Sequence, residues 1–124
     1  MKHLEEIRRY WDSRSEGYRM QVDEEIRNHR EEEYRTFFSD LPVGSEVLDI
    51  GCGPGFFTRL LSSLSMKVTA ADYSEEMLTQ AKNLLSETPD AQVRFLQTDA
   101  QKLPFDTDAF DAVVSRNLVW NLEN

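Results

Sequence analysis

The chain has 124 residues, of which 23 are Asp or Glu and 14 are Lys or Arg, so its net charge is −9. This length predicts one domain with a real hydrophobic core. The apolar runs are too short for a membrane span, Cys52 has no second cysteine to pair with, and no Cys/His cluster predicts a metal site. The acidic balance makes a nucleic acid a poor partner. We therefore expect a small, soluble, cytoplasmic protein without a signal peptide, a nucleic-acid partner or a membrane partner.

Residues 1–42 are predicted to form two helices with interleaved charges. Gly17 is expected to separate the helices, and Pro42 with Gly44 to end the second. Apolar residues fall at loose helical spacing on one stripe in each helix: Leu4, Ile7 and Trp11, then Val22, Ile26, Tyr34, Phe37, Phe38 and Leu41. The region is either a solvated helical cap or a lid over a ligand. In a lid, the aromatic residues that cover the ligand would be Tyr10, Trp11 and Tyr18.

From residue 46 the pattern changes to short apolar strands that alternate with helices. Strands are expected at 47–50, 68–71, 91–95 and 110–114, and helices at 56–64 and 75–88, the latter with Ser74 as its N-cap and Pro89 closing it. This alternation predicts an α/β fold with a parallel sheet. Because right-handed crossovers place all carboxyl ends of the strands at one edge, ligands bind at that edge. The residues that end the predicted strands are Gly51, Asp72, Asp99 and Asn117.

Three glycines, Gly51, Gly53 and Gly55, follow the first strand and precede a helix. A backbone without Cβ atoms can lie close against a ligand there, although the glycines could also serve only a tight turn. The dinucleotide-binding fingerprint would need a glycine where Phe56 stands, which disfavours a nicotinamide cofactor. Asp49 precedes the loop, and its carboxylate is available to the ammonium group of a ligand or to the amides of the loop itself.

Two further carboxylates end predicted strands. Asp72 could accept hydrogen bonds from vicinal ribose hydroxyls, or it could be a turn residue beside Ser74. Asp99 could accept from an exocyclic amine of a base, or it could be an ordinary turn acid. Cys52, inside the glycine loop, is most simply a small residue that fits there.

Five segments together resemble class I S-adenosylmethionine-dependent methyltransferases of the small-molecule type. They are the glycine loop with its strand at 47–55, the segments 71–78, 99–105 and 110–117, and the aromatic N-terminal element at 10–18. The resemblance implies a Rossmann-like sheet of strand order 3-2-1-4 with an N-terminal helical cap. It also implies S-adenosylmethionine as cofactor, S-adenosylhomocysteine as its product and a small-molecule methyl acceptor.

The resemblance implies a role for each matching residue. Gly51, Gly53 and Gly55, with Cys52 between them, would line the methionine part of the cofactor, and Asp49 would lie near its amino group. Asp72 would hold the ribose hydroxyls, Tyr73 and Met77 would pack nearby, and Asp99 with Ala100 would meet the adenine. Asn117 would lie beside the sulfonium, and Tyr18 would close over the cofactor. No catalytic residue is assigned, because methyl transfer is an in-line displacement in which positioning supplies most of the catalysis.

The family is built on seven strands, and this chain supplies the first four. The sequence therefore predicts a cap over residues 1–42 and a cofactor-binding half-domain over 43–124. The segment Ser115–Leu118 lacks the motif of enzymes that methylate nucleobase amines, and Trp120 would wall the acceptor pocket or pack under it. The chain is expected to be a methyltransferase or its cofactor-binding portion. The alternative is a binding module without turnover. In either case, an exposed fourth strand would favour self-association.

Overall fold

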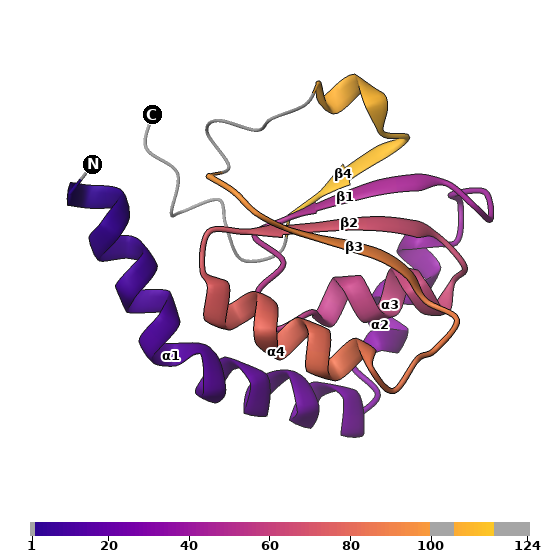
Figure 1. Ribbon diagram of the computed structural model, residues 1–124. Coiled ribbons are helices and arrows are strands. Elements are labelled where there is room, and N and C mark those ends of the chain that lie inside the picture. The colour runs from indigo at the N-terminus through magenta and orange to yellow at the C-terminus, as the bar shows by residue number, and fades with distance from the viewer. Residues whose placement is uncertain (1, 100–105, 116–124) are drawn as a thin grey trace.

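The four α-helices in the described part of the chain lie on one face of a parallel sheet (Figure 1). The structure, a computed structural model, describes residues 2–99 and 106–115. In chain order the elements are α1 (Lys2–Arg27), α2 (Glu31–Phe38), β1 (Glu46–Ile50), α3 (Phe56–Ser63), β2 (Lys67–Asp72), α4 (Glu75–Leu85), β3 (Gln92–Gln97), the short 3-10 helix η1 (Thr107–Ala109) and β4 (Ala112–Val114). The sheet order is β3-β2-β1-β4, and every pairing is parallel. The predicted α/β fold and strand order 3-2-1-4 are confirmed.

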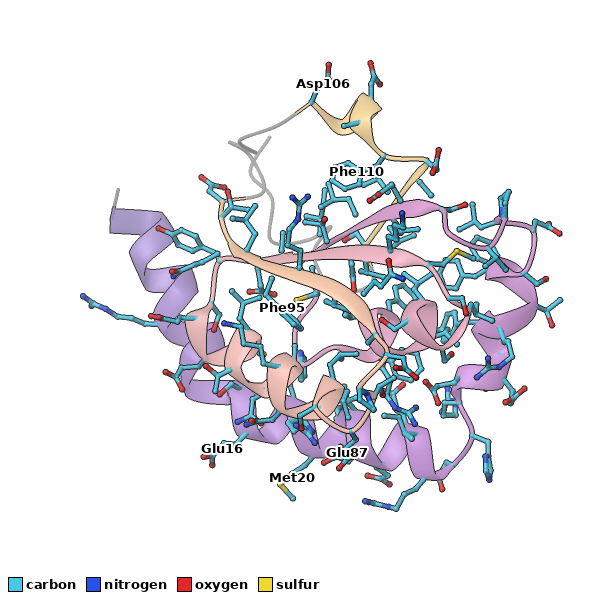
Figure 2. All side chains as sticks on the ribbon, turned by 45° about the vertical axis from the view of Figure 1, so that its right-hand side comes forward. Glu16, Met20, Glu87, Phe95, Asp106 and Phe110 are labelled. Carbon is cyan, nitrogen blue, oxygen red and sulfur yellow. The ribbon has the colours of Figure 1, made fainter. Side chains whose placement is uncertain are left out.

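The core lies between the sheet and the helices. Leu60 and Leu61 of α3 and Val47 of β1 are fully buried, and Val68 of β2 is nearly so. The side chains of α3 reach this core because apolar residues recur at helical spacing from Phe56 onward. Phe95 of β3 points from the sheet toward α4 (Figure 2), where the ammonium group of Lys82 lies 5.8 Å from the centre of its ring. Loops at both edges of the sheet connect it to the helices, and the loops that follow β1 and β2 lie at its carboxyl edge.

The prediction that Gly17 separates two helices is wrong. Helix α1 runs through Gly17 and ends at Arg27. Two residues later, His29 takes the left-handed backbone conformation with φ of 58°. A glycine inside a helix keeps its amide hydrogen bond and costs only about 1 kcal/mol relative to alanine, so packing can override it. Here Arg19 holds α1 against α4, since its guanidinium donates to the carbonyl oxygen of Gln80 at 2.9 Å.

An alanine at position 17 is expected to stabilise the protein. Gly17 is exposed on α1, and a Cβ atom built there meets nothing within 4 Å. Gly17→Ala should therefore raise the free energy of unfolding by roughly 0.5–1 kcal/mol and the melting temperature by about 2–5 °C. Thermal unfolding followed by circular dichroism measures this. An unchanged or lower melting temperature would contradict a continuous α1.

Helix α2 also differs from the prediction in one residue. Phe38 is buried, as expected, but Phe37 is 75% exposed. Two consecutive residues of a helix point about 100° apart, so they cannot both face the same core. Helix α2 is held to α3 by the ion pair between Glu31 and Arg59, and by Tyr34, whose ring meets those of Phe56 and Phe57 edge-on. The predicted apolar residues Leu4, Ile7 and Trp11 lie outside the described side chains.

The later elements follow the predicted ones with shifted ends. Ser74 caps α4 as predicted, since its hydroxyl oxygen accepts from the amide of Met77 at 3.1 Å, but α4 ends at Leu85, well before Pro89. Phe110 precedes β4 instead of belonging to it. Within the described residues β4 pairs only with β1 and forms an edge of the sheet, and Val113 is 46% exposed. Among those residues no helix is long and apolar enough to cross a bilayer.

Candidate functional site

The loop between β1 and α3 is built on glycines with left-handed backbones. Gly51, Gly53 and Gly55 have φ of 66°, 56° and 101°. Residues with side chains rarely adopt such angles, which explains glycine at every second position. The amides of Gly51 and Cys52 both donate to the carbonyl oxygen of Ala71, at 2.7 and 3.0 Å. These bonds fix the start of the loop against the end of the neighbouring strand β2.

Gly55 has a second reason to be glycine, and this reason is the packing of two helices and not contact with a ligand. A Cβ atom at this position would lie 3.2 Å from the Cβ atom of Ala81 on α4. The missing side chain lets α3 begin close to α4. Phe56, which stands at the third glycine position of the dinucleotide fingerprint, is 2% exposed and belongs to the core. The structure thus gives Gly55 a packing role, and its predicted contact with the cofactor stays a prediction.

Asp72 joins the glycine loop to the loop after β2. One carboxylate oxygen accepts from the amide of Gly53 at 2.9 Å, and the other accepts from the amide of Ser74 at 2.9 Å. The sequence pointed to a turn role beside Ser74, which the structure confirms, but gave no signal for Gly53. The Asp72 side chain is half-buried, and a carboxylate oxygen can accept more than one hydrogen bond.

Asp49 is 1% exposed on the central strand β1. Its carboxylate accepts from the hydroxyl of Thr58, in the first turn of α3, at 2.7 Å. The sequence predicted a ligand ammonium or the amides of the loop as partners of Asp49, but not the Thr58 hydroxyl. One feature of the sequence could have predicted Thr58. It is a residue with a hydroxyl group in the first turn of the helix that follows the glycines, where its side chain can donate a hydrogen bond to a buried acid.

Cys52 is buried, close enough to Asp72 and Asp49 for both charges to act on its thiol. Burial raises the pKa of its thiol well above the ordinary value, and the negative charges of Asp72 and Asp49 raise it further. A thiol in this state is a poor nucleophile. The interpretation of Cys52 as a small residue that fits the loop agrees with this environment.

The Cys52 thiol is expected to be inert in the folded protein. It should also make the folded protein less stable as the pH rises above about 9. The unfolded chain loses its thiol proton from about pH 9, while the folded chain keeps it, so the free energy of unfolding should fall as the pH rises above 9. Cys52→Ala should remove that part of the slope. Urea titrations at pH 7, 9 and 10 measure it. Labelling of the native protein by a thiol reagent at pH 8, as fast as in urea, would contradict the buried thiol.

The end of β3 lies beside the same two loops. The amide of Thr98 donates to the carbonyl oxygen of Asp72 at 3.1 Å, and the side-chain amide of Gln97 donates to that of Tyr73 at 3.2 Å. Half-buried Asp99 follows directly. Thus the structure brings the predicted residues at the ends of β1, β2 and β3 to one edge, and Met77, in the first turn of α4, is buried. Ala100, Asn117 and Trp120 lie outside the described residues.

Tyr18 of α1 is placed near the glycine loop. Tyr18 and Pro54 line the same pocket of about 520 Å³, together with Tyr34 of α2. The cap therefore meets the loop at this point, as expected if Tyr18 contributes to a ligand site. The other two predicted aromatic residues, Tyr10 and Trp11, lie outside the described side chains.

Comparison with known proteins decides the family. Residues 47–124, more than half of the chain, match the family described as Methyltransferase domain. The chain belongs to this family. The resemblance to class I S-adenosylmethionine-dependent methyltransferases is thereby confirmed.

Known methyltransferases resemble the chain in sequence and in fold. The demethylmenaquinone methyltransferase of Clavibacter sepedonicus is 41% identical over 71 residues, which cover 57% of this chain and 28% of that protein. The phosphoethanolamine N-methyltransferase 2 of Haemonchus contortus, solved in complex with S-adenosyl-L-methionine, is 29% identical with a TM-score of 0.60, over 70% of this chain and 20% of that chain. The magnesium protoporphyrin IX methyltransferase of Synechocystis PCC 6803, solved with bound cofactor, shares the fold at a TM-score of 0.73 and 21% identity, over 99% of this chain and 65% of that chain.

This methyltransferase-family chain spans less than a third of the curated relative it matches. The matched region holds the glycine loop, Asp72 and the end of β3, which are the parts of the site described above. Family membership therefore bears most directly on this part of the chain.

Proposed function

We propose that this chain binds S-adenosylmethionine at the carboxyl edge of its sheet and forms the cofactor-binding part of a methyltransferase for a small-molecule acceptor. The observation that carries the proposal is the position of Asp72. Its carboxylate holds the amides of Gly53 and Ser74 at 2.9 Å and so fixes the glycine loop relative to α4. A ligand that spans both loops would meet a preformed surface, which lowers the cost of binding.

The proposed roles follow the positions of the residues along this edge. Gly51, Gly53 and the adjacent Cys52 would lie along the methionine part, with Asp49 toward its ammonium group. Asp72 would accept from the ribose hydroxyls, with Tyr73 beside them, and Asp99 would meet the adenine. Tyr18 would close the site from the cap. We further propose roles for Gly55, Met77, Ala100 and Asn117 at the same cofactor, as the family pattern implies.

Charge supports a cationic sulfonium ligand. Asp49 and Asp72 flank the loop closely enough for both charges to act on Cys52, and the chain as a whole carries a charge of −9. Two unit charges about 4 Å apart attract by roughly 4 kcal/mol near a protein surface. Because methyl transfer is an in-line displacement, a site that holds the sulfonium and the acceptor in line supplies most of the catalysis.

A small-molecule acceptor agrees with the relatives, whose names specify demethylmenaquinone and phosphoethanolamine methyltransferases.

We propose two parts for the chain, a helical cap over 1–42 and the cofactor half-domain over 43–124. Because Val22 and Phe38 share a core with Val47, the two parts should unfold together.

The edge strand β4, with exposed Val113, supports self-association, which sedimentation across a wide concentration range tests.

Calorimetric titration of the chain with S-adenosylmethionine, S-adenosylhomocysteine and NAD tests the proposal. We expect saturable heat with both sulfur compounds and none with NAD, because Phe56 occupies the place of the fingerprint glycine. No heat with either sulfur compound would contradict the proposal. Binding without methyl transfer to any of a panel of small acceptors would favour the alternative, a module that holds the cofactor without turnover.

A further inference from the structure

The hydroxyl group of Thr58 lies where it can control the only carboxylate of β1 that is buried. Thr58 is fully buried in the first turn of α3, and its Oγ1 donates to Oδ2 of Asp49 at 2.7 Å. Asp49 is paired in register with Ala70 on one side and Val114 on the other, so it sits among apolar neighbours on the central strand. The hydrogen bond from Thr58 therefore helps to orient the Asp49 carboxylate.

The hydrogen bond from Thr58 stabilises the buried negative charge of Asp49. A buried charge is costly unless hydrogen bonds and nearby dipoles stabilise it. A hydrogen bond to an ionised acceptor is roughly twice as strong as one between neutral groups, and the Thr58 hydroxyl donates to the Asp49 carboxylate at 2.7 Å. The positive end of the α3 dipole acts in the same direction, since Thr58 belongs to the first turn of that helix.

The charge of Asp49 is felt inside the glycine loop. Burial is the main cause of the raised pKa of the Cys52 thiol, but the charges of Asp72 and Asp49 add to it. Asp49 is thus close enough to the loop to act on a charged group bound there. Asp49 lies one residue before the end of β1 and two residues before Gly51, so the carboxylate and the glycine loop share the carboxyl end of this strand.

We propose that Thr58 is a positioning residue: by orienting Asp49, it sets the affinity of the site for ligands that carry an ammonium group at their amino-acid end. This inference rests on the proposed binding of S-adenosylmethionine and deepens it. It assigns selectivity for that end of the ligand to a side chain that makes no contact with the ligand itself. Thr58 acts only through Asp49.

Two ligands separate this role from a structural one. S-adenosylhomocysteine carries the ammonium group, whereas 5′-methylthioadenosine keeps the adenine, ribose and sulfur and lacks the amino-acid end. Thr58→Val removes the hydroxyl at nearly equal volume. We expect it to weaken S-adenosylhomocysteine at least about tenfold and to change 5′-methylthioadenosine less than twofold in calorimetric titrations. Thr58→Ser keeps a hydroxyl and should restore most of the difference.

The matched control is Thr79→Val on α4, where the threonine is exposed and its hydroxyl donates only to the backbone oxygen of Glu75. It should change neither affinity. The same ratio of affinities is measured on Thr58→Ala, so the test does not depend on the folding of one variant. Equal weakening of both ligands, or no weakening of either, would overturn the positioning role. If the unaltered chain binds neither ligand, the proposed function itself fails.

Discussion

Asp72→Asn is expected to destabilise the protein and weaken S-adenosylhomocysteine about 10- to 100-fold. Asp72 presents one acceptor oxygen to the amide of Gly53 and the other to the amide of Ser74. Asparagine has one acceptor oxygen and an NH₂ group, so one of the two backbone donors would face another donor. Leaving a buried or half-buried donor without an acceptor costs roughly 1–3 kcal/mol. The melting temperature should fall by about 4–10 °C, and calorimetry should show the loss of affinity.

The control for this substitution is Asp90→Asn. Asp90 is exposed in the turn before β3, so the same chemical change should alter neither the melting temperature nor the affinity beyond experimental error. If Asp72→Asn bound S-adenosylhomocysteine as tightly as the unaltered chain, Asp72 would be no more than a turn residue. If its melting temperature were unchanged, the link between the two loops would contribute nothing to stability.

Gly55→Ala should be the most destabilising small substitution in the glycine loop. Its φ of 101° is unfavourable for any residue with a side chain, at a cost of about 1–2 kcal/mol. The new methyl group would also lie 3.2 Å from the Cβ atom and 3.4 Å from the Cα atom of Ala81, so α3 and α4 would have to separate. Together these effects should lower the free energy of unfolding by about 2–4 kcal/mol, which urea titration measures.

Gly17→Ala is the matched control for Gly55→Ala, because it adds the same methyl group to a helical glycine with open space around it. The two substitutions are expected to have opposite signs. If Gly55→Ala were as well tolerated as Gly17→Ala, α3 would not depend on its close approach to α4. The contrast separates backbone conformation and packing from the general cost of removing a glycine.

The sequence predicted the sheet and its order because each strand and helix carries its own local pattern. Val47 and Leu48 on β1 and the glycines that follow are sufficient to place a strand, a loop and a helix in order. The carboxyl ends of β1, β2 and β3 then had to meet at one edge, so Asp72 and Asp99 could be predicted as neighbours of the glycine loop.

What the sequence could not predict depends on contacts between distant segments. The bond from Gly53 to Asp72 and the bond from Thr58 to Asp49 join residues 19 and 9 positions apart, and no local pattern encodes them. Gly17 carried a helix-ending signal that tertiary packing of α1 on α4 overrides, through Arg19 and Gln80. The left-handed turn at His29 gave no decisive signal: histidine is enriched at that conformation among residues other than glycine, but glycine and asparagine are the usual residues that end a helix there.

The most direct test of the account is a titration of the ¹⁵N-labelled chain with S-adenosylhomocysteine, followed by the shifts of its backbone amides. We expect saturable shifts that are largest at Gly51, Gly53, Ser74 and Asp99, which lie on three different connections at one edge of the sheet. A folded protein whose amides do not shift at millimolar ligand would contradict the account. Saturable shifts confined to α2 and the amino-terminal ends of the strands would contradict it as well.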